Sequence, residues 1–234
     1  MTRRWSGYRR SWTALPAAQR WMLLGLAAAL VLANIRQPYP AIAPLQHIPT
    51  VALIIAAPPL LWRFPLSDRS VAALLAFFLL HTLAGRYTYS NVPYDAWARA
   101  VLGHDVSSLL GLTRNDFDRV VHFSFGLLWV GPVAEVARRH GGLSRRAGIC
   151  IGFLFVGAAS AAYETFEWLL TVVLAPGMAD DYNGQQGDVW DSQKDMATAI
   201  VGALVTSTWL LWRMPRSGRG VNPRTAAPAF PASA

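Results

Sequence analysis

Residues 149–175 read ICIGFLFVGAASAAYETFEWLLTVVLA, and this stretch decides the fold class of the chain. An apolar run of this length exceeds the roughly 20 residues that a helix needs to cross a bilayer. Because a backbone inside hydrocarbon must satisfy its own hydrogen bonds, the run predicts a transmembrane helix. Its two charged residues, Glu164 and Glu167, have apolar neighbours on both sides, and such residues are costly within a membrane.

Five further apolar blocks flank this run, separated by prolines, arginines or polar loops. The first three blocks are short, and they reach spanning length only with flanks in which Trp21, Trp62 and Tyr87 can lie at headgroup level. The segment 85–118 has no sustained apolar run and predicts an extramembrane loop with a short interfacial helix. We expect an all-α, multi-pass membrane helix bundle with about six transmembrane helices, near residues 21–35, 48–62, 71–84, 119–137, 149–175 and 196–212.

The composition supports this class and excludes others. The chain is 53% hydrophobic and 15% charged, whereas soluble domains carry about 25% charged residues. The net charge of +8 comes from arginines beside apolar blocks, which is typical of membrane proteins, so we expect membrane lipids and no nucleic acid as partners. A single cysteine excludes a disulfide framework and a cysteine-based metal site.

The basic residues also predict the orientation. With the N-terminus inside, 15 of the 21 arginines and lysines fall on the inner side and six on the outer side. The positive-inside rule therefore places both termini in the cytoplasm of a bacterium, with the bundle in the inner membrane. We divide the chain into a basic cytoplasmic segment (1–20), a six-helix transmembrane domain (21–212) and a disordered cytoplasmic tail (213–234) rich in Pro, Ala, Ser and Arg.

Two local patterns concern the helices themselves. Ala41-Ile42-Ala43 resembles a signal-peptide cleavage site, but prolines surround it, so we favour retention of the first helix while leaving cleavage open. Gly148-x-x-x-Gly152 and the small residues 157–162 predict close packing of the fifth helix against a neighbour.

Ionisable residues of the last three helices fall at matching depths. At 1.5 Å rise per residue, His122, Glu164 and Asp195 lie about 24–27 Å above the arginines that end their helices. Asp118, Glu167 and Asp191 lie about one turn higher, each on the same helix face as its partner. Together with Asp188 and Lys194, which is the only lysine of the chain, they form a candidate polar, proton or metal site near the outer face.

Simpler interpretations remain for single residues. Asp118 could cap a helix or act as a first-turn acid, and His122 could be a packing histidine with its hydrogen bonds satisfied. Residues 184–196 could form a solvated loop with a helix start. Glu135, at the inner end, is expected to pair with Arg138 or Arg139 and extend towards the membrane surface.

Four motifs carry a resemblance to a known family. They are Asp118-x-x-x-His122-x-x-x-Gly126, Pro132-x-x-Glu135, Tyr163-Glu164-x-x-Glu167-Trp168 and the segment from Gly184 to Met196. The chain resembles the bacterial YjdF-like inner-membrane family over about residues 20–212, with Asn183 as a departure from the expected apolar residue. More loosely, it is similar to VanZ-like membrane proteins. These resemblances imply membrane placement, and neither supplies a reaction.

Three functions remain open, because the sequence has none of the motifs HExxH, GxSxG, CxxC, the Walker loop or the dinucleotide fingerprint. The first is a metal-dependent envelope or lipid-modifying enzyme, since carboxylates and His suit divalent metals. The second is a proton- or cation-coupled transporter, against which stands the lack of an inverted repeat. The third is a non-catalytic envelope protein whose polar cluster joins helices or binds a partner.

Overall fold

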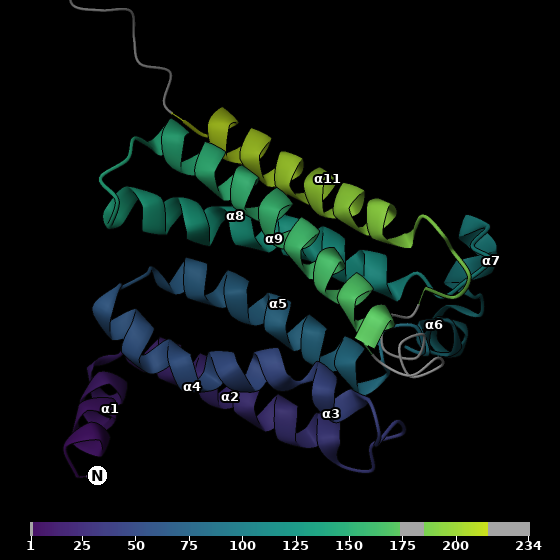
Figure 1. Cartoon of the computed structure of the whole chain (residues 1–234), viewed down its shortest axis with the longest axis horizontal. Helices are drawn as coiled ribbons and strands as arrows, with labels where there is room; N and C mark the ends of the chain where they lie inside the picture. Colours follow the sequence, from purple (N-terminus) through teal and green to yellow (C-terminus); the bar gives the residue numbers. More distant parts are fainter. Residues whose placement is uncertain (1, 174–184, 215–234) are drawn as a thin grey trace, which may run out of the picture.

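The computed structural model describes residues 2–173 and 185–214, and every regular element in these ranges is a helix. Figure 1 shows the long helices lying side by side, with α6 and α7 at one end and α1 at the other. The elements are α1 (Thr2–Ala14), α2 (Ala17–Asn34), α3 (Ala43–Gln46), α4 (Ile48–Arg63), α5 (Asp68–Arg86), α6 (Tyr94–Leu102), α7 (Val106–Leu110), α8 (Phe117–Arg139), α9 (Arg145–Val173) and α11 (Asp191–Trp212).

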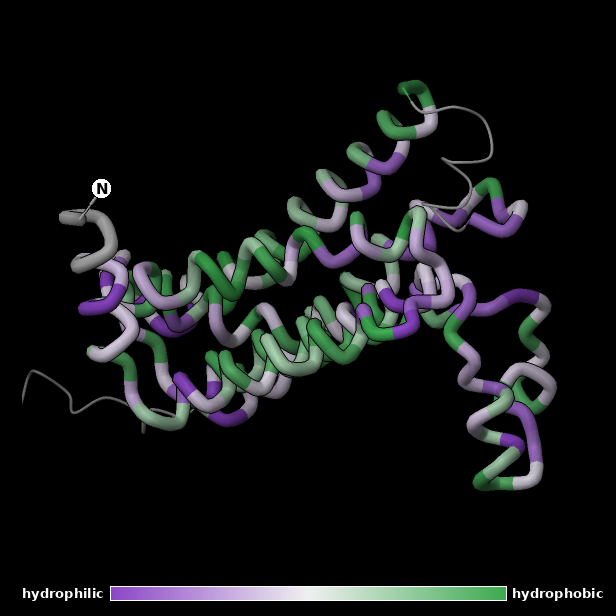
Figure 2. Tube along the Cα trace, turned by 90° about the horizontal axis from the view of Figure 1, so that it is seen from below, coloured by the Kyte–Doolittle hydropathy of each residue, from purple (hydrophilic) through white to green (hydrophobic). Residues whose placement is uncertain are grey.

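Six segments of the described chain are long and apolar enough to cross a membrane, which confirms the expected fold class. They are α2, α5, α8, α9, α11 and the continuous stretch Ala43–Arg63 that holds α3 and α4. Figure 2 shows hydrophobic residues along the long helices and hydrophilic residues concentrated towards the ends of the molecule. The short early blocks do extend into their flanks, since α2 begins at Ala17 and α5 continues to Arg86.

Two differences from the sequence-based expectation concern the extramembrane segments. The segment expected to hold one short helix contains two, α6 and α7, each ended by a glycine in the left-handed conformation, Gly103 and Gly111. The basic N-terminal segment also contains a helix, α1. The expected disorder of 213–234 falls almost wholly on residues outside the described ranges.

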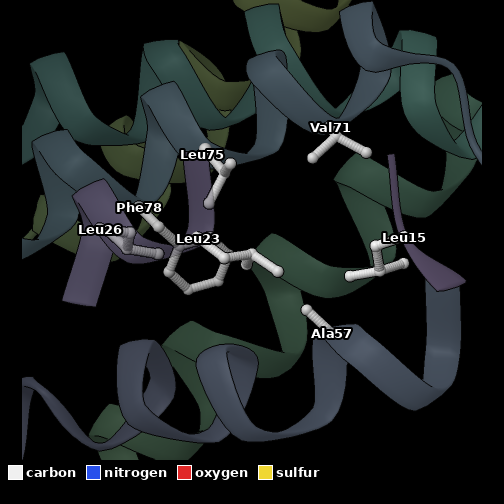
Figure 3. Packing of buried hydrophobic residues seen from close by; sticks show 7 residues of the cluster. All are labelled: Leu15, Leu23, Leu26, Ala57, Val71, Leu75 and Phe78. Atoms are coloured by element: carbon white, nitrogen blue, oxygen red, sulfur yellow. The ribbon is translucent and has the colours of Figure 1, made fainter. Parts of the chain in front are cut away.

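The bundle has two halves, each with its own apolar core. In the first half, α2, α4 and α5 surround a cluster that includes Leu23, Leu26 and Leu75, drawn in Figure 3. In the second half, α8, α9 and α11 pack around Val130, Val156 and neighbouring alanines. Contacts of α5 with α8 join the halves. The second half carries the candidate site.

Glycines set how closely the helices of the second half approach. A Cβ atom at Gly126 of α8 would lie 1.9 Å from the carbonyl oxygen of Ala199 on α11, so only glycine fits there. The expected packing at Gly148 and Gly152 is confirmed, because Cβ atoms there would lie 2.9 and 2.5 Å from carbonyl oxygens of α8. It is wrong at Gly157, where a Cβ would meet no described atom within 4 Å.

Candidate functional site

Three ionisable side chains from three helices converge near the end of the bundle at which α8 and α11 begin. His122 comes from α8, Glu164 from α9 and Asp195 from α11. Nε2 of His122 lies 3.5 Å from Oε1 of Glu164 and 3.8 Å from Oδ2 of Asp195. One ligand atom from each residue lies within 4.8 Å of the other two. The structure thus brings together the three residues that share a depth in the sequence, here named the triad.

The two carboxylates of the triad are buried, His122 is partly buried, and the hydrogen bonding is incomplete. Glu164 and Asp195 are 5% and 4% exposed, and Oε1 of Glu164 and Oδ1 of Asp195 accept no hydrogen bond from any described residue. A buried polar atom without a partner carries a large desolvation cost. Such atoms call for a cation, a proton or a ligand donor in the space between the helices.

The spacing of the triad discriminates between these occupants. Direct hydrogen bonds between side chains have heavy-atom distances of about 2.7–3.2 Å, which are shorter than the 3.5 and 3.8 Å found here. Ligand atoms about 2.1 Å from a divalent metal lie about 3–3.5 Å from one another. The two distances from Nε2 of His122 are therefore at or beyond the spacing of ligands around one metal ion, and they are too long for direct hydrogen bonds.

A second layer of acids lies beside the triad and pairs with Arg114. Its guanidinium donates to Asp191 at 2.5 Å and to Asp118, and its Nε lies 3.1 Å from Asp116. Burial alone would lower the pKa of Arg114, but Asp118 and Asp191 raise it above its ordinary value. Asp118, Asp191 and Asp195 also have ligand atoms within 4.8 Å of one another. Arg114 therefore offsets only part of the negative charge of Asp116, Asp118 and Asp191.

A third layer faces the outside of the bundle. Asp188 accepts from Lys194 at 2.7 Å and from Arg119 at 2.8 Å, and the hydrogen bond from Lys194 is the main cause of the lowered pKa of Asp188. The side chain of Lys194 is 49% exposed. Lys194 is thus placed to compensate Asp188 and not the triad.

Sequence reasoning missed the two arginines that hold the outer layers together, because it counted them only as basic residues of a loop. The available signal was helical spacing: Arg114 lies four residues before Asp118, and Arg119 lies three residues after Asp116. Glu167 lies three residues beyond Glu164 on α9 and belongs to neither potential ligand group. Asp118 lies in the first turn of α8, but its pairing with Arg114 gives it more than a capping role.

Glu135 differs from the expectation. It does pair, at 2.7 Å, with Arg139, which is one of the two arginines predicted as its partner. However, its carboxylate is buried and turns towards α5, where it accepts hydrogen bonds from the backbone N–H of Ser67 at 2.8 Å and from the hydroxyls of Ser67 and Ser70. The helix N-terminus attracts the negative charge more than the membrane surface does.

An apolar cavity of about 240 Å³ adjoins the triad on the side of α5. His122 lies in its wall, together with Phe77, Phe78 and Phe125. His81 also lines it, with a buried Nε2 that has no hydrogen-bond partner among the described residues. The cavity places apolar surface directly beside the polar triad.

The comparisons with known proteins agree with this architecture. The family described as "Predicted membrane protein (DUF2238)" matches residues 18–216. The chain is 35% identical over 151 residues to "Inner membrane protein YjdF" of Escherichia coli (strain K12), which covers 63% of this chain and 67% of that protein. No solved structure matches the chain. A match over most of the chain, together with six apolar helices, places it in a membrane as a multi-pass protein. The chain therefore belongs to the DUF2238 family of predicted membrane proteins.

Proposed function

We propose that this protein is a metal-dependent enzyme of the bacterial envelope that acts on a lipid or a lipid-linked molecule. The observation that carries the proposal is the triad, in which one imidazole nitrogen and two carboxylate oxygens from separate helices lie within 4.8 Å. A mixed set of nitrogen and oxygen ligands suits borderline and hard divalent metals. Three protein ligands leave coordination positions for a substrate oxygen and for water.

The surroundings of the triad support chemistry at an anionic group. Nε of Arg119 lies 3.9 Å from Oδ1 of Asp195, and it has no hydrogen-bond partner among the described residues. A fixed guanidinium beside a metal can stabilise negative charge that develops on a phosphate or carbonyl oxygen. The metal would polarise the same oxygen and activate a water molecule.

The adjoining cavity supports a lipid substrate. Its volume of about 240 Å³ is below the roughly 300–1,000 Å³ of complete small-molecule pockets, so it suits part of a ligand. Phe77, Phe78 and Phe125 offer an apolar wall to a hydrocarbon chain. A lipid could thus place its chain against α5 and its polar group at the triad.

A transporter receives less support from the packing below the triad. Val130, Val156, Ala199 and Ala203 are all fully buried there, in contact across α8, α9 and α11. Gly126 lets the backbones of α8 and α11 touch at the same level. Alternating access would require these close contacts to separate, whereas an enzyme with a site open to one side can keep them.

The test is turnover of lipid by the reconstituted protein. Purified protein would be placed in vesicles of total bacterial membrane lipid with Mn²⁺ or Mg²⁺, and the lipids compared by mass spectrometry with and without a chelator. We expect at least one lipid species to change with the wild-type protein and metal. The change should be absent after chelation and in Glu164→Gln, and retained in Asp105→Asn, an acid paired with Arg99 outside the site. Identical lipid profiles for wild type and Glu164→Gln would reject the enzyme.

A further inference from the structure

The end of the bundle opposite the triad contains a second cavity, of about 630 Å³. It lies where α5 and α9 begin and where α8 and α11 end, and Figure 1 shows these helix ends together on the left. Gly131, Ile149 and Leu210 form part of its lining, so small and apolar surface reaches into it from the membrane-spanning helices. The cavity shares no lining residue with the one beside the triad.

Arginines from three helices line this cavity. Arg69 comes from α5, Arg138 and Arg139 come from α8, and Arg145 comes from α9. Arg139 is paired with Glu135 at 2.7 Å. Arg69, Arg138 and Arg145 form no ion pair with any described residue, although two carboxylates also line the cavity.

The two acids that line the cavity are already engaged. Glu135 accepts hydrogen bonds from Ser67 and Ser70 as well as from Arg139. Asp68 accepts a hydrogen bond from Nε2 of Gln19 at 2.8 Å. The hydrogen bond from the neutral amide of Gln19 leaves the charge of Asp68 in place, so the four arginines and two acids of the lining leave a net charge of +2 for a ligand.

We propose that this cavity binds a phosphate-bearing anion through Arg69, Arg138 and Arg145. The planar guanidinium group matches phosphate oxygens with two parallel hydrogen bonds. Basic pockets between transmembrane helices hold the headgroups of anionic phospholipids. The apolar lining at Ile149 and Leu210 would accept the glycerol and the first part of an acyl chain, so a phospholipid headgroup is the expected source and free phosphate is the other. The positive-inside rule explains arginines at this end in general, but not their convergence on one cavity.

The test compares two triple variants that remove the same charge. The test variant Arg69→Gln/Arg138→Gln/Arg145→Gln removes three arginines from the lining of the cavity. The control variant Arg63→Gln/Arg146→Gln/Arg213→Gln removes three arginines that lie near the same helix ends but do not line the cavity. Binding of phosphatidylglycerol and of phosphatidylcholine from mixed detergent micelles would be measured by native mass spectrometry, and inorganic phosphate would be added as competitor. A third variant, Arg69→Lys/Arg138→Lys/Arg145→Lys, keeps the positive charge.

We expect the wild-type protein to retain phosphatidylglycerol over phosphatidylcholine. The cavity variant should weaken this retention by on the order of 100-fold, at roughly fivefold for each arginine, with the control variant close to wild type. The lysine variant should recover part of the binding. Competition by millimolar phosphate without lipid preference would assign the cavity to free phosphate. Two results would overturn the proposal, because only general surface charge would then be acting. One is an equal loss of phosphatidylglycerol binding in both glutamine variants. The other is a wild-type protein that neither prefers phosphatidylglycerol nor responds to added phosphate.

Discussion

The substitution Gly126→Ala tests the packing on which the triad depends. A Cβ at this position would lie 1.9 Å from the carbonyl oxygen of Ala199 and 2.6 Å from the backbone nitrogen of Ala203. Ordinary contact begins at 3.4 Å, so the shortfall from 1.9 Å is 1.5 Å. Both contacted atoms belong to the backbone, which cannot rotate away as a side chain can. The helices α8 and α11 must therefore separate by about this distance or tilt.

The cost follows from this displacement. Overpacking of a well-packed interior costs about 1–3 kcal/mol, and a backbone contact this short belongs at the upper end. Replacing glycine with alanine inside a helix stabilises it by about 0.5–1 kcal/mol, so the free energy of unfolding should fall by about 2 kcal/mol in total. His122 lies one turn before Gly126, and Asp195 lies one turn before Ala199. Metal–ligand distances in a bound site stay within about 0.2 Å of their ideal values, so a separation of the helices by about 1.5 Å should also weaken metal binding.

Thermal unfolding in detergent and metal content after gel filtration would measure both effects. Gly131→Ala is the matched control, because Gly131 lies on the same helix and a Cβ there meets no described atom within 4 Å. We expect Gly126→Ala to unfold at a lower temperature and to lose metal, whereas Gly131→Ala should equal or slightly exceed the wild-type stability. Equal stability and metal content in the two variants would refute the close contact between α8 and α11.

Three further predictions concern other parts of the chain. Glu135→Gln should lower the free energy of unfolding by about 2–3 kcal/mol, because the charge-assisted hydrogen bonds to Ser67 and Ser70 are weakened, and unchanged denaturation would contradict this. Reporter fusions at Gly141 and Gly103 should report opposite sides of the membrane, with Gly141 cytoplasmic, and matching signals would reject the orientation predicted from the basic residues. Deletion of residues 215–234 should leave insertion and unfolding temperature unchanged, since their composition cannot supply a packed core, and degradation of the truncated protein would count against it.

Length and hydropathy were sufficient to predict the spans, because a bilayer demands apolar helices of defined length. Counting residues from the terminal arginines also placed His122, Glu164 and Asp195 at one level. This worked because the three helices run nearly side by side and their rise is fixed. The pairs at i,i+3 and i,i+4 added the helix face on which each side chain lies.

The depth of a residue along its helix axis does not show which side chains or helix ends from other elements contact it. Arg114 precedes α8 and turns back onto Asp118 and Asp191, a contact with α11 that depends on tertiary structure. His81 reaches the cavity beside the triad from α5, which belongs to the other half of the bundle. Glu135 was expected at the surface because its neighbours are arginines, yet the N-terminus of α5 lies close enough to bind it. Each miss involves a partner distant in sequence.

The central claim is that His122, Glu164 and Asp195 bind one divalent metal ion, and pulsed electron paramagnetic resonance of the Mn²⁺-loaded protein tests it most directly. Mn²⁺ accepts the same nitrogen and oxygen ligands, and nitrogen coordinated to it produces a characteristic modulation of the signal. We predict one bound Mn²⁺ per chain with modulation from one imidazole nitrogen. The modulation should be lost in His122→Gln, and the ion should be lost in Glu164→Gln. Absence of bound Mn²⁺ from the wild-type protein, or nitrogen modulation that persists in His122→Gln, would contradict the claim.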